Sequence, residues 1–198
     1  MITIVDYKAG NLASVQKAFA YLGHHTQVTE DPARVRQAEK IVLPGVGNFA
    51  AVQRLADTGL ADAIAERIRA GVPFLGICVG MQWLYEASTE APAVAGLGAL
   101  RGTVARFHCD FKIPHVGWNT IKPAQDSRIL KGIPREGFVY YTHSYRCPIT
   151  EGVVASTTYG EEFAAVVERD NVYGVQFHPE KSSTVGLQIL KNFCEVQR

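Results

Sequence analysis

The chain has 198 residues, of which 47% are apolar and 20% are charged, and its formal net charge at pH 7 is +1. This length and composition are typical of one globular domain with a full hydrophobic core, so we expect a single domain over residues 1–198. The near-neutral charge and the scattered basic residues argue against a nucleic-acid partner. The apolar runs are far shorter than the roughly 20 residues of a membrane span, so no membrane partner is expected.

The N-terminus and the cysteine spacing indicate the cellular compartment that we expect for the protein. The segment 1–6 has no basic region before its apolar run and reaches an acidic residue too early for a signal peptide, so we expect a cytoplasmic protein. The four cysteines lie far apart and form no CxxC pair: Cys78, Cys109, Cys147 and Cys194. We therefore expect neither a disulfide framework nor a metal site, and no cofactor.

The first half of the chain alternates predicted strands with predicted helices. Apolar runs predict strands over 2–5, 26–29, 40–43 and 72–78. Helical spacing and capping residues predict helices over 12–22, 32–38, 60–70 and 81–86. Such alternation indicates an α/β fold with a mainly parallel open sheet and helices on both faces.

The sequence pattern changes after about residue 91, where glycine, proline and short alternating runs dominate. We predict shorter, partly antiparallel strands that continue the same domain, over 103–107, 138–141, 153–158, 164–168 and 172–177. A final helix is expected over 184–196, and the segment 87–98 permits no assignment.

The sequence around Cys78 predicts a strand, a tight turn and a helix. Gly76 and Gly80 flank the cysteine at two residues on either side, where a sharp turn leaves room only for small residues. A cysteine at a helix N-terminus is favoured as a thiolate. The plain alternative is a buried structural cysteine between packing glycines.

A second motif lies at the end of the last predicted strand, where His178 is followed by Pro179 and Glu180. Residues two apart in an extended chain point to the same side, and proline biases the residue before it towards extended geometry. Glu180 would then orient His178, and the imidazole would face a nucleophile. A surface turn with an incidental histidine is the alternative.

A third motif is the glycine-rich segment 44–47, which follows the third predicted strand. Its exposed backbone N–H groups suit an oxyanion hole, although a plain turn between a strand and a helix would have the same sequence pattern. Ligands in parallel sheets bind at the carboxyl ends of strands, where this segment and Cys78 both lie. Together the motifs predict acyl transfer through a thioester, with Cys78 as nucleophile, His178 as general base and acid, and Glu180 as its orienting group. Val79 would add an oxyanion N–H.

These residues resemble a known family. The segments 76–82 and 177–180 look like those of the class I (triad) glutamine amidotransferases, which have a flavodoxin-like α/β fold. The segments 6–12, 44–47, 114–119, 143–145 and 178–182 are similar to the glutaminase subunits of imidazole glycerol phosphate synthases, and the resemblance runs from residue 2 to about 193.

The resemblance implies an activity and a partner. The chain would hydrolyse glutamine to glutamate and ammonia in histidine biosynthesis. It would form a heterodimer with a (β/α)8-barrel cyclase, which uses the ammonia to make imidazole glycerol phosphate and AICAR. The family's glutaminase is largely silent until the cyclase binds its ligand, and a loop peptide that flips near Gly45 and Val46 offers a physical switch.

The resemblance also implies roles for single residues. Cys78, His178 and Glu180 would be catalytic, and Val46, Gly47 and Val79 would form the oxyanion hole. The glutamine site would be formed by Gly45, Gln82, His143, Ser144 and Tyr145. The partner interface would include Trp118, Asn119, Tyr140 and Lys181.

Two positions depart from the family pattern, and the sequence leaves more than one possible acceptor for the ammonia. Lys8 stands where the family usually has glycine, and Asn48 stands where histidine is frequent. Sister enzymes in surface-sugar pathways share much of the pattern, so one alternative is an amidotransferase that serves another synthase. A stand-alone γ-glutamyl hydrolase and a non-catalytic regulatory module with a relic site are the others.

Overall fold

A computed structural model describes residues 1–197 and contains one large mixed sheet. In the described part of the chain this sheet has nine strands in the order β2-β1-β3-β4-β12-β11-β10-β7-β8. The strands from β2 to β12 are parallel: β1 (Ile2–Val5), β2 (Thr26–Thr29), β3 (Lys40–Gly45), β4 (Phe74–Cys78) and β12 (Val172–Val175). Every residue of β1, β4 and β12 is buried, as expected for parallel strands covered on both faces.

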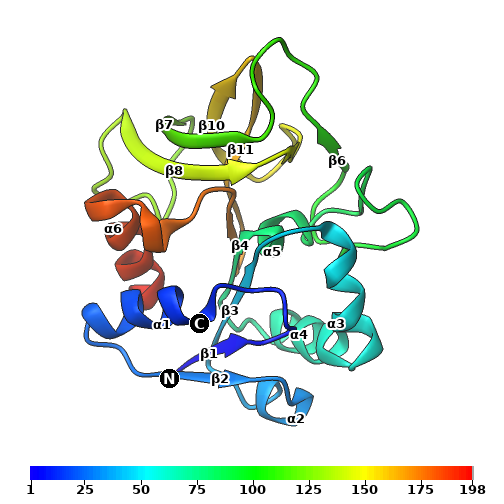
Figure 1. Cartoon of the computed structure of the whole chain (residues 1–198). Coiled ribbons are helices and arrows are strands. Elements are labelled where there is room, and N and C mark those ends of the chain that lie inside the picture. Colours follow the sequence, from blue (N-terminus) through cyan, green and yellow to red (C-terminus); the bar gives the residue numbers. More distant parts are fainter. Residues whose placement is uncertain (198) are drawn as a thin grey trace.

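The antiparallel part of the sheet continues beyond β12 and lies at the top of Figure 1. Its strands are β7 (His115–Pro123), β8 (Gly137–His143), β10 (Val153–Tyr159) and β11 (Glu161–Arg169). A small second sheet contains β5 (Ala87–Ser88), β6 (Thr103–Arg106) and β9 (Tyr145–Arg146). The expected α/β sheet is therefore confirmed, with a parallel half and an antiparallel extension.

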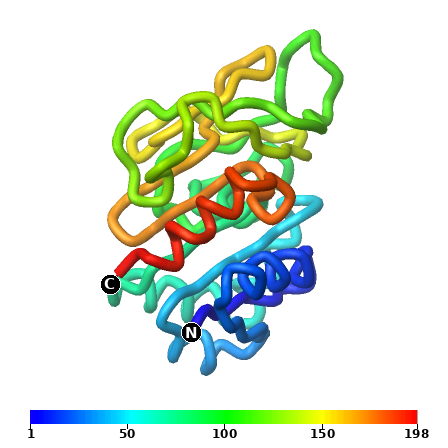
Figure 2. Tube along the Cα trace, turned by 90° about the vertical axis from the view of Figure 1, so that its left-hand side faces the viewer, coloured from blue at the N-terminus to red at the C-terminus, as the bar shows by residue number. Residues whose placement is uncertain are grey.

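Helices cover both faces of the parallel half (Figure 1). On one face α1 (Leu12–Tyr21) packs against α6 (Ser183–Glu195), and Figure 2 shows these two helices, blue and red, side by side. The opposite face carries α3 (Gln53–Asp57) and α4 (Leu60–Arg69), with α2 (Pro32–Val35) packed against α4. Three short elements complete the chain: α5 (Val79–Gln82) and the 3-10 turns η1 (Phe49–Val52) and η2 (Pro179–Lys181).

The predicted elements differ from the structure mainly at their ends. The helix expected to reach residue 38 ends at Val35, and the helix after Cys78 covers Val79–Gln82 rather than 81–86. The third strand extends two residues further, to Gly45. No strand was predicted for β7, and no helix for residues 49–57.

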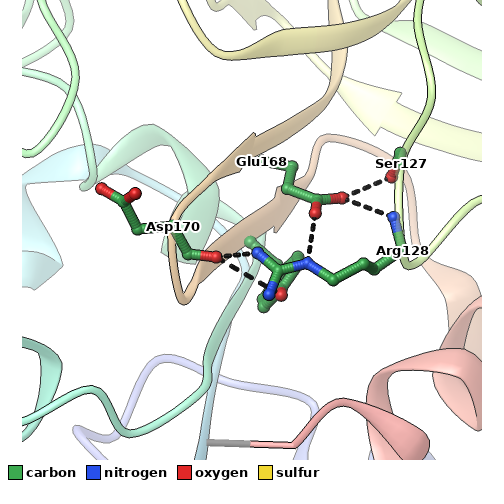
Figure 3. Close-up of polar contacts among 5 residues, drawn as sticks. Ser127, Arg128, Glu168 and Asp170 are labelled. Atoms are coloured by element: carbon green, nitrogen blue, oxygen red, sulfur yellow. Dashed lines mark hydrogen bonds and ion pairs between the residues drawn. The ribbon is translucent and has the colours of Figure 1, made fainter.

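A polar cluster at one end of the antiparallel strands fixes the loop that follows β7 (Figure 3). The Glu168 carboxylate accepts hydrogen bonds from the Ser127 hydroxyl at 2.6 Å and from the Arg128 backbone N–H at 2.9 Å. The Arg128 guanidinium pairs with Glu168 and also donates to the Asp170 carbonyl. The polar groups of this cluster are therefore paired with one another, and their role is to anchor the loop.

Residues 1–197 were also considered for membrane-spanning helices and for clusters of metal-ligating side chains, with these results. None of the helices in this range is both long and apolar enough to cross a membrane. The same range contains no group of three or more histidine, cysteine and acidic side chains placed to hold a metal ion.

Candidate active site

Cys78 lies at the end of β4 in a strained backbone conformation. Its φ of 54° and ψ of −108° are unusual for a residue with a side chain, and its exposed fraction is 3%. The flanking glycines are required by close backbone contact. A Cβ at Gly76 would lie 2.4 Å from the Gly80 carbonyl oxygen, and one at Gly80 would lie 1.9 Å from the Leu43 carbonyl oxygen. The predicted sharp turn is therefore present, and it places the thiol at the carboxyl end of the parallel strands.

His178 and Glu180 form a buried pair beside this thiol. His178 follows β12, the strand next to β4, and its Nδ1 lies 2.9 Å from Glu180 Oε1. Burial disfavours the charged imidazole, but contacts with Cys78 and Glu180 outweigh it and raise the pKa of His178 well above its usual value. The structure therefore brings the three predicted catalytic residues together, and the acidic partner fixes the ring so that Nε2 is left for the thiol.

A pocket of about 170 Å³ opens over Cys78 and His178. Its lining includes most residues predicted for the oxyanion hole and the substrate site: Val46, Gly47, Val79, Gln82, His143, Ser144 and Tyr145. Glu90 also lines it, and one carboxylate oxygen accepts the Phe49 N–H at 2.8 Å. Sequence reasoning missed Glu90 because it lies in the segment 87–98, which has no periodic pattern.

Gly45 is the one predicted substrate-binding residue that is not part of the pocket lining. It ends β3 as the register partner of Cys78 but is not part of the pocket lining. A Cβ at this position would lie 2.3 Å from the Tyr7 hydroxyl oxygen and 2.8 Å from Val79 Cβ. The substrate role of Gly45 stays a prediction, and the structure adds a separate reason for glycine at this position, because the backbone is tightly packed there.

The glycine-rich loop holds one predicted oxyanion donor away from the pocket. The Val46 N–H donates to the Ala9 carbonyl at 2.7 Å, while Gly47 has a φ of +90°. Val79 begins α5, so its N–H has no acceptor within that helix. In this conformation the Val79 N–H is available to a substrate oxygen, and the Val46 N–H is not.

Lys8 and Asn48, the two departures from the family pattern, flank this loop. Lys8 has a φ of 66°, a region that favours glycine, and its side chain pairs with Asp6 at 2.9 Å and Glu30 at 2.8 Å. The Asn48 side chain accepts the Ala50 N–H at 2.7 Å and caps η1. Both residues therefore have local structural roles.

A pair of neutral histidines consists of His143, which lines the pocket, and His115, whose ring centroid lies 5.2 Å from that of His143. Burial lowers the pKa of His143 to about 3 and that of His115 to about 4. The Nδ1 of His143 lies 2.8 Å from the Tyr145 carbonyl oxygen, which can only accept, so this nitrogen carries the proton. His143 Nε2 must then accept from His115 Nδ1, 3.2 Å away. The tautomers of both rings are thus determined by one carbonyl.

Two of the four residues predicted for a partner interface, Trp118 and Tyr140, share one face of β7 and β8. Trp118 and Tyr140 are register partners with ring centroids 6.0 Å apart, and Trp118 is 53% exposed. The Tyr140 carbonyl accepts the His178 N–H at 2.9 Å. Lys181 is exposed and lies in η2, which packs against β8, whereas Asn119 is half-buried beside His115.

Comparison with known proteins defines the class. The chain matches the family model for glutamine amidotransferase class-I over residues 3–196, and it belongs to this family. Solved structures agree on the fold. A glutamine amidotransferase crystal structure superposes with a TM-score of 0.78 at 18% identity, covering 98% of each chain. PurLQS from Thermotoga maritima gives 0.75 at 19% identity, covering 98% of this chain and 96% of that one.

Sequence relatives are more specific. The chain is 48% identical over 200 residues to the imidazole glycerol phosphate synthase subunit HisH of Moorella thermoacetica, covering 100% of this chain and 95% of the relative. It is 44% identical over 198 residues to subunit HisH of Methanocaldococcus jannaschii, covering 99% and 100%. The resemblance found in the sequence motifs is therefore confirmed along the whole chain.

Proposed function

We propose that the chain is the glutaminase subunit of an imidazole glycerol phosphate synthase, which hydrolyses glutamine and delivers ammonia to a separate cyclase subunit. The observation that carries the proposal is the placement of a strained cysteine and a buried His178–Glu180 pair on one small pocket. The near-full-length similarity to HisH subunits supports the choice of synthase.

The reaction follows from the site. The Cys78 thiol passes its proton to His178 and its sulfur attacks the side-chain amide carbon of glutamine, while the Val79 N–H stabilises the oxygen that becomes negative. The carbon–nitrogen bond then breaks, and His178 gives a proton to the departing ammonia. Water attacks the thioester while His178 takes its proton, which releases glutamate and restores the thiol. The Glu90 carboxylate on the pocket wall suits the α-ammonium group of the substrate.

Regulation is part of the proposal. With the Val46 N–H bound to the Ala9 carbonyl, the oxyanion hole lacks one donor, and a missing donor of this kind typically lowers kcat by about 10²–10³-fold. A partner that favours a flipped peptide, in which the Val46 N–H faces the pocket, would raise kcat by a similar factor. We therefore infer low glutaminase activity for the isolated chain.

The docking face supports a partner next to the site. Val116, Trp118 and Phe138 are exposed, and they alternate along β7 and β8 so that their side chains share one face. Thr142, the register partner of Val116, lines the pocket. An apolar face continuous with the pocket mouth suits a barrel subunit that receives ammonia directly, because a close fit there excludes water.

The test is glutamate release from glutamine by the purified chain, alone and with the cyclase subunit of the same source and its nucleotide ligand. We expect slow release alone, a rise of about 10²-fold or more with both, and no release from Cys78→Ala. Full activity without the partner would contradict the regulation. Absence of hydrolysis in every mixture, with Cys78 intact and the chain folded, would overturn the glutaminase activity itself.

A further inference from the structure

A buried glutamine beside the nucleophile belongs to none of the motifs discussed above. Gln176 follows β12, two residues before His178, and has an exposed fraction of 0%. Its backbone N–H is bound to the Ala165 carbonyl at 2.9 Å. Its side-chain Nε2 lies 3.7 Å from the Sγ of Cys78, a hydrogen-bond contact for sulfur.

The direction of this contact is fixed by a chain of hydrogen bonds that begins at a backbone carbonyl. The Tyr145 carbonyl can only accept, so the group of Gln82 that faces it at 3.2 Å must be the amide NH₂. The same nitrogen lies 3.2 Å from the Gln176 side chain, which must therefore present its oxygen to Gln82. The remaining end of Gln176 is the NH₂, and it points at the Cys78 sulfur.

A second contact acts in the same direction. The Cys147 thiol, fully buried, donates to Gln176 Oε1 at 3.6 Å. Burial raises the pKa of Cys147, so it remains a protonated donor. A flipped Gln176 amide would set its NH₂ against the Gln82 NH₂ and the Cys147 S–H, which is unfavourable for both contacts.

We propose that Gln176 is a further catalytic residue, whose side-chain N–H donates to the Cys78 sulfur and stabilises and orients its thiolate form. The proposal rests on the proposed function, since it concerns the nucleophile of that reaction. Hydrogen bonds to charged groups are stronger than those to neutral ones, so the N–H favours the ionised sulfur over the thiol. His178 and Gln176 follow the same strand two residues apart, so one strand end supplies both the imidazole of the proposed base and the amide that contacts the sulfur.

The variant Gln176→Met tests this, because it keeps a side chain of similar length and removes the donor. We expect the pH midpoint of Cys78 alkylation by iodoacetamide to rise by about one to two pH units. The kcat/KM for glutamine at pH 7 should fall by about 10–100-fold and should recover partly as the pH is raised. A packing role alone would lower activity without moving the alkylation midpoint and without recovery at high pH.

The design needs two controls. Cys109 and Cys194 are partly exposed, so alkylation is followed on the Cys78 peptide by mass spectrometry. The matched variant is Asn192→Leu, which also removes a buried amide, one that binds the Ile129 and Lys131 carbonyls outside the pocket. It should lower stability and leave the Cys78 midpoint unchanged.

A measurement on the wild-type chain keeps the proposal testable if Gln176→Met does not fold. The assigned side-chain amide signals of Gln176 in a ¹H–¹⁵N spectrum should shift with the same pH midpoint as Cys78 alkylation. Signals that stay constant across that midpoint, or an unchanged midpoint in folded Gln176→Met, would overturn the proposal. Hydrolysis of glutamine by the wild-type chain would still stand, so failure of this inference is distinguishable from failure of the proposed function.

Discussion

Gly45 and Cys78 are register partners at the carboxyl ends of the neighbouring parallel strands β3 and β4. This pairing joins the glycine-rich loop to the nucleophile, because each strand leaves the sheet at the same level. The two turns pack so closely that the position of one depends on the other: the Cβ site of Gly45 is 3.0 Å from the Gly80 nitrogen. Changes in the loop should therefore act on the geometry of the cysteine turn.

The first prediction concerns this packing. Gly80→Ala would place a methyl group 1.9 Å from the Leu43 carbonyl oxygen, and backbone atoms of two packed elements cannot yield easily. We expect the free energy of unfolding to fall by about 3 kcal/mol or more, with loss of glutaminase activity. Urea unfolding provides the measurement.

The control is Gly132→Ala, where φ is +76° and the surrounding space is open. Only backbone strain arises there, so the free energy of unfolding should fall by about 1 kcal/mol. Equal costs at positions 80 and 132 would show that the contact with Leu43 does not constrain the turn.

The second prediction concerns the acidic partner of His178. In Glu180→Gln the carboxylate that helps to raise the pKa of His178 is lost, so this pKa falls. The His178 ring then loses its proton at a lower pH, so the alkaline limb of the kcat profile should move to lower pH. We expect kcat to fall by about 10²–10⁴-fold, because the ring loses both its orientation and the charge that stabilises it. The exposed Glu162→Gln serves as control, and an unchanged pH profile in Glu180→Gln would contradict the role of Glu180.

Much of this site was predictable from local sequence because strand ends, glycine spacing and the His178–Glu180 pair are local features. The mainly parallel sheet followed from the strand–helix alternation. Gln176 could not be found in this way. A glutamine in a predicted strand indicates nothing by itself, and its contacts with Gln82 and Cys78 join residues almost a hundred positions apart.

The errors have physical causes too. The strand β7 contains polar residues and a glycine with φ of +137°, so it lacks the alternation of a half-buried strand, yet pairing with β8 along its length holds it in the sheet. The substrate role of Gly45, which the family resemblance implies, stays a prediction. The close packing of Gly45 against Tyr7 is a contact that no local pattern encodes.

The third prediction concerns stability in acid. His115 and His143 have pKa values lowered by burial, whereas in the unfolded chain both titrate near 6.5. As the pH falls below 6.5 the unfolded chain binds protons that the folded chain does not, so stability is lost on the acid side. The slope approaches about 1.4 kcal/mol per pH unit for each histidine between pH 6.5 and 4.

Urea unfolding at several pH values measures this slope. The variant His115→Gln should show a smaller slope than the wild type, since one titrating group is gone. The exposed His25→Gln should leave it unchanged. A slope that is the same in the wild type and His115→Gln would contradict the neutral state of the buried pair.

The last prediction concerns the docking face and rests on the proposed partner. Trp118 is 53% exposed and contacts Tyr140, whose carbonyl holds the backbone of His178, so the side chain is available to a partner beside the site. Aromatic residues at the centre of an interface typically contribute 2 kcal/mol or more, so Trp118→Ala should weaken cyclase binding by about 30-fold or more. Tyr21→Ala is the matched control, because Tyr21 is a 78% exposed aromatic at the end of α1. Titration calorimetry with the cyclase subunit measures both, and equal affinities for Trp118→Ala and Tyr21→Ala would place the partner on a different surface.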